Sequence, residues 1–219
     1  MAAARAGPGN SCVPHRGTSG VHHERASTWR HVATPDEQLR QELAPIGDWR
    51  RTTLARAAVL CPLVAVDGQD HLLLVVRNAE LRTHAGQVAF PGGMQDGDES
   101  PLATALRECH EEIGVPATAV TPLGELPPRE SSSHVLVHCV VARVAPVPLL
   151  PDAKEVARVL RVPLRSLLDD ANWHERSWDP GDGRPPRLLP HFAIGEHLLW
   201  GLTGRFVRDL LVVLRGAAG

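Results

Sequence analysis

Hydrophobic and polar positions follow two patterns along this chain. Apolar runs rich in β-branched and aliphatic residues, bounded by glycine, proline or aspartate, predict strands. The turn sequence Gly68-Gln69-Asp70 separates the first two runs and predicts that they pair as a hairpin. The predicted strands span residues 57–66, 71–76, 88–90, 120–126, 135–144, 156–162, 173–178 and 187–194.

Capping residues, prolines and a glycine mark the helices. Thr34 and Ser100 each precede a proline and are predicted N-caps, Glu37 completes a capping box, and Gly114 ends the second helix. The predicted helices span about residues 34–45, 101–113, 163–170 and 203–214. Strands mixed with these helices predict an α+β fold, in which helices cover both faces of a mixed β-sheet.

The first 33 residues differ from the rest of the chain. They are rich in Ala, Gly, Ser, Pro, Arg and His and show no periodicity, so we interpret residues 1–33 as a flexible tail before one domain over residues 34–219. The four arginines and the single acid Glu24 weakly resemble an organellar transit peptide. We favour a loose or misassigned start over a targeting segment.

Charge and composition argue against several classes of partner. A formal net charge of −2 is no electrostatic reason to expect binding to nucleic acid or to a membrane surface. No apolar run approaches the roughly 18 residues of a membrane span. Cys61, Cys109 and Cys139 lie in apolar runs and are predicted to be buried, and no CxxC pair indicates a zinc or redox site. We therefore expect a cytoplasmic protein.

The predicted helix over residues 101–113 carries both an apolar stripe and a group of acids. The stripe recurs at intervals of four, three and four and is expected to pack on the sheet through Leu102, Leu106, Cys109 and Ile113. Glu108, Glu111 and Glu112 project from another sector, where like charges cost about 0.2–0.5 kcal/mol per pair and oppose the helix dipole. A divalent cation would remove both costs; a solvated acidic face is the alternative.

The acids also belong to a longer pattern with fixed spacing. With x as any residue, the pattern reads Gly93-x5-Glu99-x7-Arg107-Glu108-x2-Glu111-Glu112-x-Gly114. It resembles the Nudix box at every fixed position, with Cys109 in a slot that is usually aliphatic. The resemblance implies a Nudix fold, with a mixed β-sheet in an α/β/α sandwich. It also implies a metal-dependent hydrolase, a pyrophosphatase that cuts a diphosphate bond.

The same resemblance implies roles for individual residues. The expected cofactor is Mg²⁺, which Mn²⁺ can replace, held by Gly92, Gly93, Glu108, Glu111 and Glu112. Glu99 and Arg107 are implied to hold the loop to the helix and to orient the acids, so they join the three glutamates in the predicted catalytic set. A surface ion pair with Glu111 is the alternative for Arg107. Glu155 is a candidate further metal ligand or base, or equally a plain surface acid.

A second motif lies directly before the box, in residues 73–93. It resembles the signature of the coenzyme A pyrophosphatase branch of the family, with Val75 in the usual threonine slot, through Leu73, Leu74, Arg77, Arg82, Gly86, Phe90, Pro91, Gly92 and Gly93. Arg77 and Arg82 are expected to pair with substrate phosphates, although surface cations are the alternative. The full predicted substrate-binding set is Arg77, Arg82, His84, Gly86 and Phe90.

The expected reaction is hydrolysis of coenzyme A to adenosine 3′,5′-bisphosphate and 4′-phosphopantetheine. ADP-ribose or a nucleoside triphosphate is the alternative substrate. A non-catalytic nucleotide sensor with this fold is an alternative of another class, but such proteins typically lose acids of the box, and here all are present. The sequence leaves open whether the protein forms a homodimer and whether free, acylated or oxidised coenzyme A is preferred.

Overall fold

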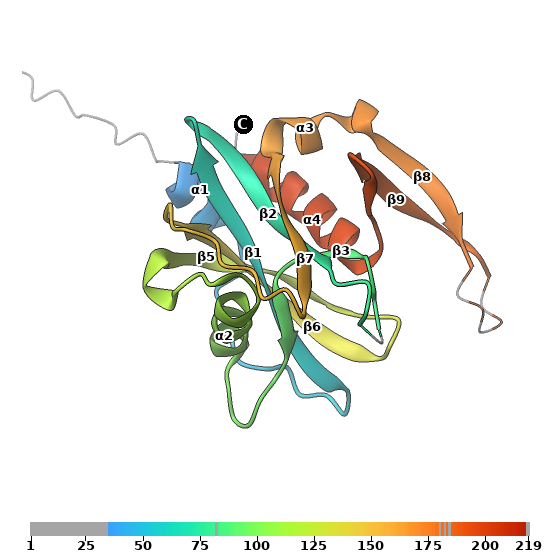
Figure 1. The fold of residues 1–219 in the computed structure, drawn as a ribbon, viewed down its shortest axis with the longest axis horizontal. Coiled ribbons are helices and arrows are strands. Elements are labelled where there is room, and N and C mark those ends of the chain that lie inside the picture. Colours follow the sequence, from blue (N-terminus) through green and yellow to red (C-terminus); the bar gives the residue numbers. More distant parts are fainter. Residues whose placement is uncertain (1–34, 82, 180, 182, 184, 218–219) are drawn as a thin grey trace, which may run out of the picture. The chain divides into compact units, whose positions relative to one another are not determined.

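The computed structural model describes residues 35–81, 83–179, 181, 183 and 185–217. These residues form the predicted α+β fold, in which helices cover both faces of a mixed β-sheet (Figure 1). The predicted tail over residues 1–33, the predicted cap Thr34 and the signature residue Arg82 lie outside the described residues.

The main sheet is mixed, as predicted. Among the described residues it has seven strands: β1 (Ala55–Val66), β2 (Gln69–Arg77), β3 (Val88–Ala89), β4 (Gly92–Met94), β5 (Val120–Glu130), β6 (Val135–Val144) and β7 (Val156–Pro163). The order is β3-β2-β1-β6-β5, with β4 paired to β1 and β7 paired to β2. β1 and β6 run parallel, and the other strand pairs are antiparallel. The pairing of Val66 with Gln69 confirms the predicted hairpin.

Apolar side chains of the sheet enter two cores, one on each face. The first lies against α2 (Pro101–Ile113) and includes Leu60, Ala105, Cys109, Ile113 and Val140. The second lies against α1 (Pro35–Glu42), α3 (Leu164–Leu168) and α4 (Gly201–Ala217) and includes Leu39, Leu167, Phe206 and Leu210. Figure 1 shows α2 and α4 on opposite sides of the sheet. Segments from both ends of the described chain therefore cover one face, and α2 covers the other.

The boundaries of α2 are those predicted, and its buried face agrees with the predicted stripe at Leu102, Cys109 and Ile113. Ser100 caps the helix by accepting a hydrogen bond from the N–H of Ala103 at 3.2 Å, and Gly114 ends it with φ of 73°. Ala105 is completely buried, whereas Leu106 is only half-buried, so the predicted apolar stripe is wrong at Leu106. Ala105 packs on the sheet in its place, and Glu112 on the same helix is almost completely buried.

A smaller sheet follows, in the order β10-β9-β8: β8 (Trp173–Trp178), β9 (Arg187–Ile194) and β10 (His197–Leu199). The sequence prediction missed β4 and β10 because three residues are too few to show an alternating pattern. It also placed the start of α4 two residues late and the end of α3 two residues late, at Asp170, where the 3₁₀ turn Asp170–Asn172 begins. A further 3₁₀ turn spans Ala117–Ala119.

One expectation from composition is met in the described part of the chain. Cys61, Cys109 and Cys139 are buried free thiols, as predicted from their apolar surroundings. Within the described residues, none of the helices combines the length and the apolar character that crossing a membrane requires.

Candidate active site

The three glutamates of α2 are buried to different depths, from the protein interior to the solvent-exposed surface. Their side chains are 2% exposed for Glu112, 15% for Glu108 and 56% for Glu111. Glu112 accepts hydrogen bonds from the backbone N–H of Gly92 at 3.1 Å and from Nη1 of Arg77 at 3.3 Å. The deepest acid of α2 is therefore bound to β4 on one side and to the end of β2 on the other.

Arg107 connects the other acids of the box. Its Nε and Nη2 donate to the Glu99 carboxylate at 2.8 and 3.1 Å, and Nη2 also donates to the Met94 carbonyl at 3.0 Å. Its Nη1 donates to both Glu108 and Glu111 at 2.8 Å. The pair with Glu111, the alternative role predicted for Arg107, is thus only one of several contacts. One guanidinium brings together three carboxylates that are spread over thirteen residues of sequence from Glu99 to Glu111.

Two glycines allow β4 to lie close to both β1 and α2. At Gly92, φ is 155° and a Cβ atom would lie 2.5 Å from the Ala58 carbonyl oxygen, so only glycine fits. At Gly93, a Cβ atom would overlap the Glu108 carboxylate. The glycine turn therefore holds its backbone directly against the acids of α2.

Burial and mutual repulsion disfavour charge on these acids. Burial is the main cause that raises the pKa of Glu112 to about 7, with Glu108 and Glu155 adding to it, while the Gly92 N–H and Arg77 act against it. The pKa of Glu108 is raised chiefly by burial and lowered in part by Arg107. By contrast, the hydrogen bond from Arg107 lowers the pKa of Glu99. The site therefore holds more negative charge than its two arginines stabilise.

Glu155 joins this group, although it is far from α2 in sequence. Its carboxylate is close enough to raise the pKa of both Glu108 and Glu112. Its segment is fixed on two sides, because Asn78 donates its N–H to the Glu155 carbonyl at 2.8 Å and Asp152 donates its N–H to the Glu112 carbonyl at 3.0 Å. The exposed carboxylate of Glu155 is thus available at the edge of the cluster.

The donor set fits a hard divalent cation. Glu108, Glu111, Glu112 and Glu155 offer carboxylate oxygens, which Mg²⁺ and Mn²⁺ prefer. Glu108 and Glu111 already converge on one cationic group, Nη1 of Arg107. In the described part of the chain, no three acidic, His or Cys side chains yet stand together as a metal site. A bound cation would take over the neutralisation that Arg107 and Arg77 supply to Glu108, Glu111 and Glu112.

Glu99 is also held from its backbone side. The indole Nε1 of Trp49 donates to the Glu99 carbonyl at 2.6 Å, and Nε2 of Gln95 donates to the same oxygen at 3.0 Å. The ring of the buried His138 meets the Trp49 ring edge-on, with centroids 5.0 Å apart. Sequence reasoning missed Trp49 because it lies 50 residues from Glu99 and in no motif. Trp49 is a positioning residue for the loop that carries Glu99.

Trp49→Phe should therefore weaken the site while it keeps the ring packing. Loss of one hydrogen bond worth about 0.5–1.5 kcal/mol predicts a roughly three- to tenfold higher half-saturating Mg²⁺ concentration, together with a lower kcat. Trp173→Phe is the matched control, because Trp173 donates a comparable bond to the Leu167 carbonyl at 2.8 Å. Equal Mg²⁺ dependence in the two variants, measured by metal titration of activity, would contradict this role.

The predicted substrate-binding residues occupy different environments. Arg77 lies against Glu112. His84 is exposed, has φ of 57°, and its Nδ1 lies 3.0 Å from Oε1 of Gln87. Gly86 closes the same loop by donating its N–H to the Arg77 carbonyl at 3.1 Å. Phe90 is 3% exposed, and its ring belongs to the core on the α4 face. The structure thus brings Arg77 to the acids and places Phe90 beneath the surface.

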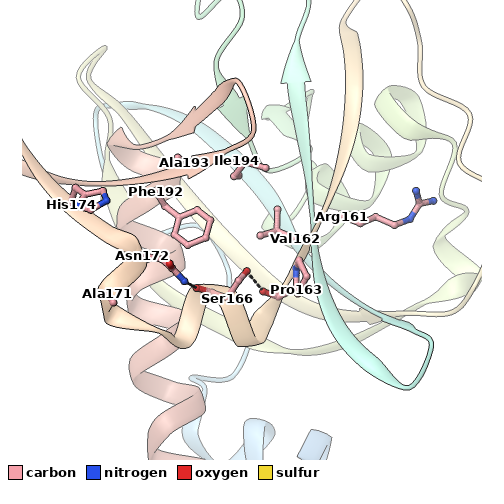
Figure 2. A pocket seen from close by; sticks show the side chains of 10 residues that line it. All are labelled: Arg161, Val162, Pro163, Ser166, Ala171, Asn172, His174, Phe192, Ala193 and Ile194. Atoms are coloured by element: carbon pink, nitrogen blue, oxygen red, sulfur yellow. Dashed lines mark hydrogen bonds between the residues drawn. The ribbon is translucent and has the colours of Figure 1, made fainter.

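A cavity of about 390 Å³ lies elsewhere, between β7 and β9. Figure 2 shows Phe192 and Val162 pointing into it and the Arg161 side chain pointing away. Val162 pairs with Leu72, at the opposite end of β2 from Arg77, so this cavity is separate from the carboxylate cluster.

Comparison with known proteins gives consistent matches. Residues 54–180 match the family model described as the NUDIX domain. The chain is 40% identical over 156 residues to the "Uncharacterized Nudix hydrolase NudL" of Photorhabdus laumondii, covering 70% of this chain and 82% of that protein. It is 39% identical over 160 residues to the protein of the same description from Yersinia pestis, covering 72% and 79%.

Among solved structures, the chain is similar to that described as "a Nudix Hydrolase from M. Smegmatis, RenU". The TM-score is 0.46 with 25% sequence identity, and the match covers 58% of this chain and 81% of that one.

Proposed function

The chain belongs to the Nudix hydrolase family, and we propose that its reaction is the Mg²⁺-dependent hydrolysis of the diphosphate bond of coenzyme A. In this reaction the oxygen of one water molecule joins a phosphorus atom of the diphosphate. The bridging P–O bond breaks, and the protons of water are released or pass to the departing phosphate. The products are adenosine 3′,5′-bisphosphate and 4′-phosphopantetheine.

The observation that carries this proposal is the place of Arg77. Arg77 belongs to the signature that resembles the coenzyme A branch, and its Nη1 lies 3.3 Å from the Glu112 carboxylate. Its Nε is buried and has no hydrogen-bond partner among the described residues. A buried donor without a partner is costly unless a ligand accepts its bond. Arg77 is therefore suited to bind a diphosphate oxygen next to the metal-binding acids.

Each group at the site has a distinct task in this reaction. Glu108, Glu111 and Glu112, with Glu155 and a carbonyl of the glycine turn, would hold the Mg²⁺, for which Mn²⁺ can substitute. When bound, the cation neutralises phosphate oxygens and lowers the pKa of water. Arg107 keeps Glu108 and Glu111 directed to one point, and Glu99 keeps Arg107 in place. Arg77 orients the substrate.

A substrate panel tests the proposal. With Mg²⁺ present, kcat/KM for coenzyme A should exceed that for ADP-ribose and for nucleoside triphosphates by about tenfold or more, a difference of about 1.4 kcal/mol. Mass spectrometry should identify the two products named above. A clear preference for ADP-ribose or a nucleoside triphosphate would replace the coenzyme A proposal. Tight nucleotide binding with no Mg²⁺-dependent turnover of any substrate would favour the non-catalytic sensor.

A further inference from the structure

Three arginines from separate parts of the chain lie near the first half of α4. Arg205 lies in the second turn of α4, and Asp209 follows it one turn later on the same helix. Arg129 of β5 binds Asp209 through two hydrogen bonds of 2.7 Å. Arg187, the first residue of β9, is close enough to repel Arg205, and its guanidinium lies 5.5 Å from the Trp178 ring. We call Arg129, Arg187 and Arg205 the arginine cluster.

Described residues balance the positive charge of this cluster only in part. Asp209 uses both carboxylate oxygens on Arg129. Within the described residues, Arg205 forms no hydrogen bond or ion pair, and its side chain is exposed. The residue is exposed but not fully surrounded by solvent: partial burial is the main cause that lowers the pKa of Arg205, repulsion from Arg129 and Arg187 adds to it, and attraction to Asp209 acts against it. Like charges held together in this way cost stability, so the cluster is better explained by an anion that it binds than by the fold.

The cluster lies on the side of the protein that carries the substrate signature. α4 follows directly after β10, and β10 contacts β3, the strand that follows the loop in which Gly86 lies and that begins after Arg77. α4 also contacts β5 and β9, which supply the two other arginines. In the main sheet, Arg129 pairs with Val137, which pairs with Ala57, which pairs with Met94 at the end of the glycine turn. Arg129 therefore lies in the same row of the sheet as the end of the glycine turn, three strands away from it.

We propose that the arginine cluster is a subsite for a phosphate monoester of the substrate. This inference rests on the proposed function, under which the group is the 3′-phosphate of coenzyme A. A phosphate monoester carries nearly two negative charges near pH 7 and offers three acceptor oxygens, which planar guanidinium groups bind in pairs. Arg205 supplies a charge that forms no ion pair among the described residues, Arg187 supplies a second one, and Asp209 holds Arg129 in a fixed orientation.

The test compares coenzyme A with 3′-dephospho-coenzyme A. Arg205→Gln should lower kcat/KM for coenzyme A by about ten- to a hundredfold and change that for the dephospho compound by less than about threefold. Arg208→Gln on the same helix is the matched control, because Arg208 pairs with Asp170 at 2.7 Å, outside the cluster. The Tm of Arg205→Gln should hold or rise, since the substitution relieves repulsion. Equal weakening of both substrates, or no difference from Arg208→Gln, would overturn the inference.

A binding measurement separates this inference from the proposed reaction. Calorimetry of wild type should show adenosine 3′,5′-bisphosphate binding about tenfold or more tightly than AMP, and Arg205→Gln should abolish that preference. If coenzyme A is not hydrolysed but the preference exists and depends on Arg205, the proposed substrate is wrong and the phosphate subsite stands. If wild type binds both nucleotides equally, the subsite is wrong whichever substrate is cleaved.

Discussion

Replacing Glu112 by Gln is expected to lower kcat by about a thousandfold or more while the protein stays folded. The amide keeps the size of the side chain but removes one ligand charge from a site in which the metal should supply several kcal/mol of transition-state stabilisation. The measurement is kcat at saturating Mg²⁺ with coenzyme A. A variant that retains most of its turnover would exclude Glu112 from the metal site.

The same substitution should change how stability depends on pH in the metal-free protein. Folding raises the pKa of Glu112 from 4.5 to about 7, so the folded state binds this proton more tightly than the unfolded state does. The contribution of Glu112 to the stability of wild type should therefore be largest below about pH 4.5. Wild type should lose up to about 3 kcal/mol as the pH rises to about 7. Glu112→Gln has no such group and should lack this decline.

Urea denaturation in EDTA at pH 5 and pH 8 measures this difference. Between the two pH values, wild type should lose more stability than Glu112→Gln, because only wild type must keep a charged carboxylate buried. Addition of Mg²⁺ at pH 8 should restore stability to wild type more than to the variant, since a ligand stabilises the state that binds it. The same pH dependence in both proteins would show that the charge on Glu112 costs nothing in the fold.

Replacing Arg107 by Lys is expected to have the second-largest effect, a loss of about a hundredfold in kcat/KM with a higher requirement for Mg²⁺. Lysine keeps the charge but cannot bridge Glu99, Glu108 and Glu111 as the planar guanidinium does. Loss of two charge-assisted hydrogen bonds, each worth about 1.5–3 kcal/mol, is enough for that change. Steady-state kinetics over a range of Mg²⁺ concentrations measures both effects.

Arg143 offers a matched control for Arg107. It also bridges two carboxylates: its Nη2 lies 2.6 Å from Asp36 of α1, and its Nη1 lies 2.5 Å from Asp70 of β2. Arg143→Lys should lower the free energy of unfolding, while kcat and the Mg²⁺ requirement stay near those of wild type. If Arg107→Lys behaved in the same way, Arg107 would be a structural ion-pair residue and not an organiser of the site.

Local sequence determined much of this fold. α2 has the predicted boundaries because its start and end depend on Ser100, Pro101 and Gly114, whose effects act within one helical turn. β6, β8 and β9 also match their predicted ranges, since each is an apolar or alternating run between turn residues. The family motif could likewise be recognised from spacing alone, because its residues act from neighbouring turns of one loop and one helix.

Only the tertiary structure decided how the site is built. No pattern within α2 distinguishes Glu112, almost fully buried between β4 and Arg77, from the exposed Glu111. The bonds of Trp49 to Glu99 and of Arg129 to Asp209 join residues 50 and 80 positions apart. Such contacts depend on which faces of the sheet the helices cover and at what rotation. Packing of the whole core decides the position and rotation of each helix. Local propensity and residue spacing do not determine that packing.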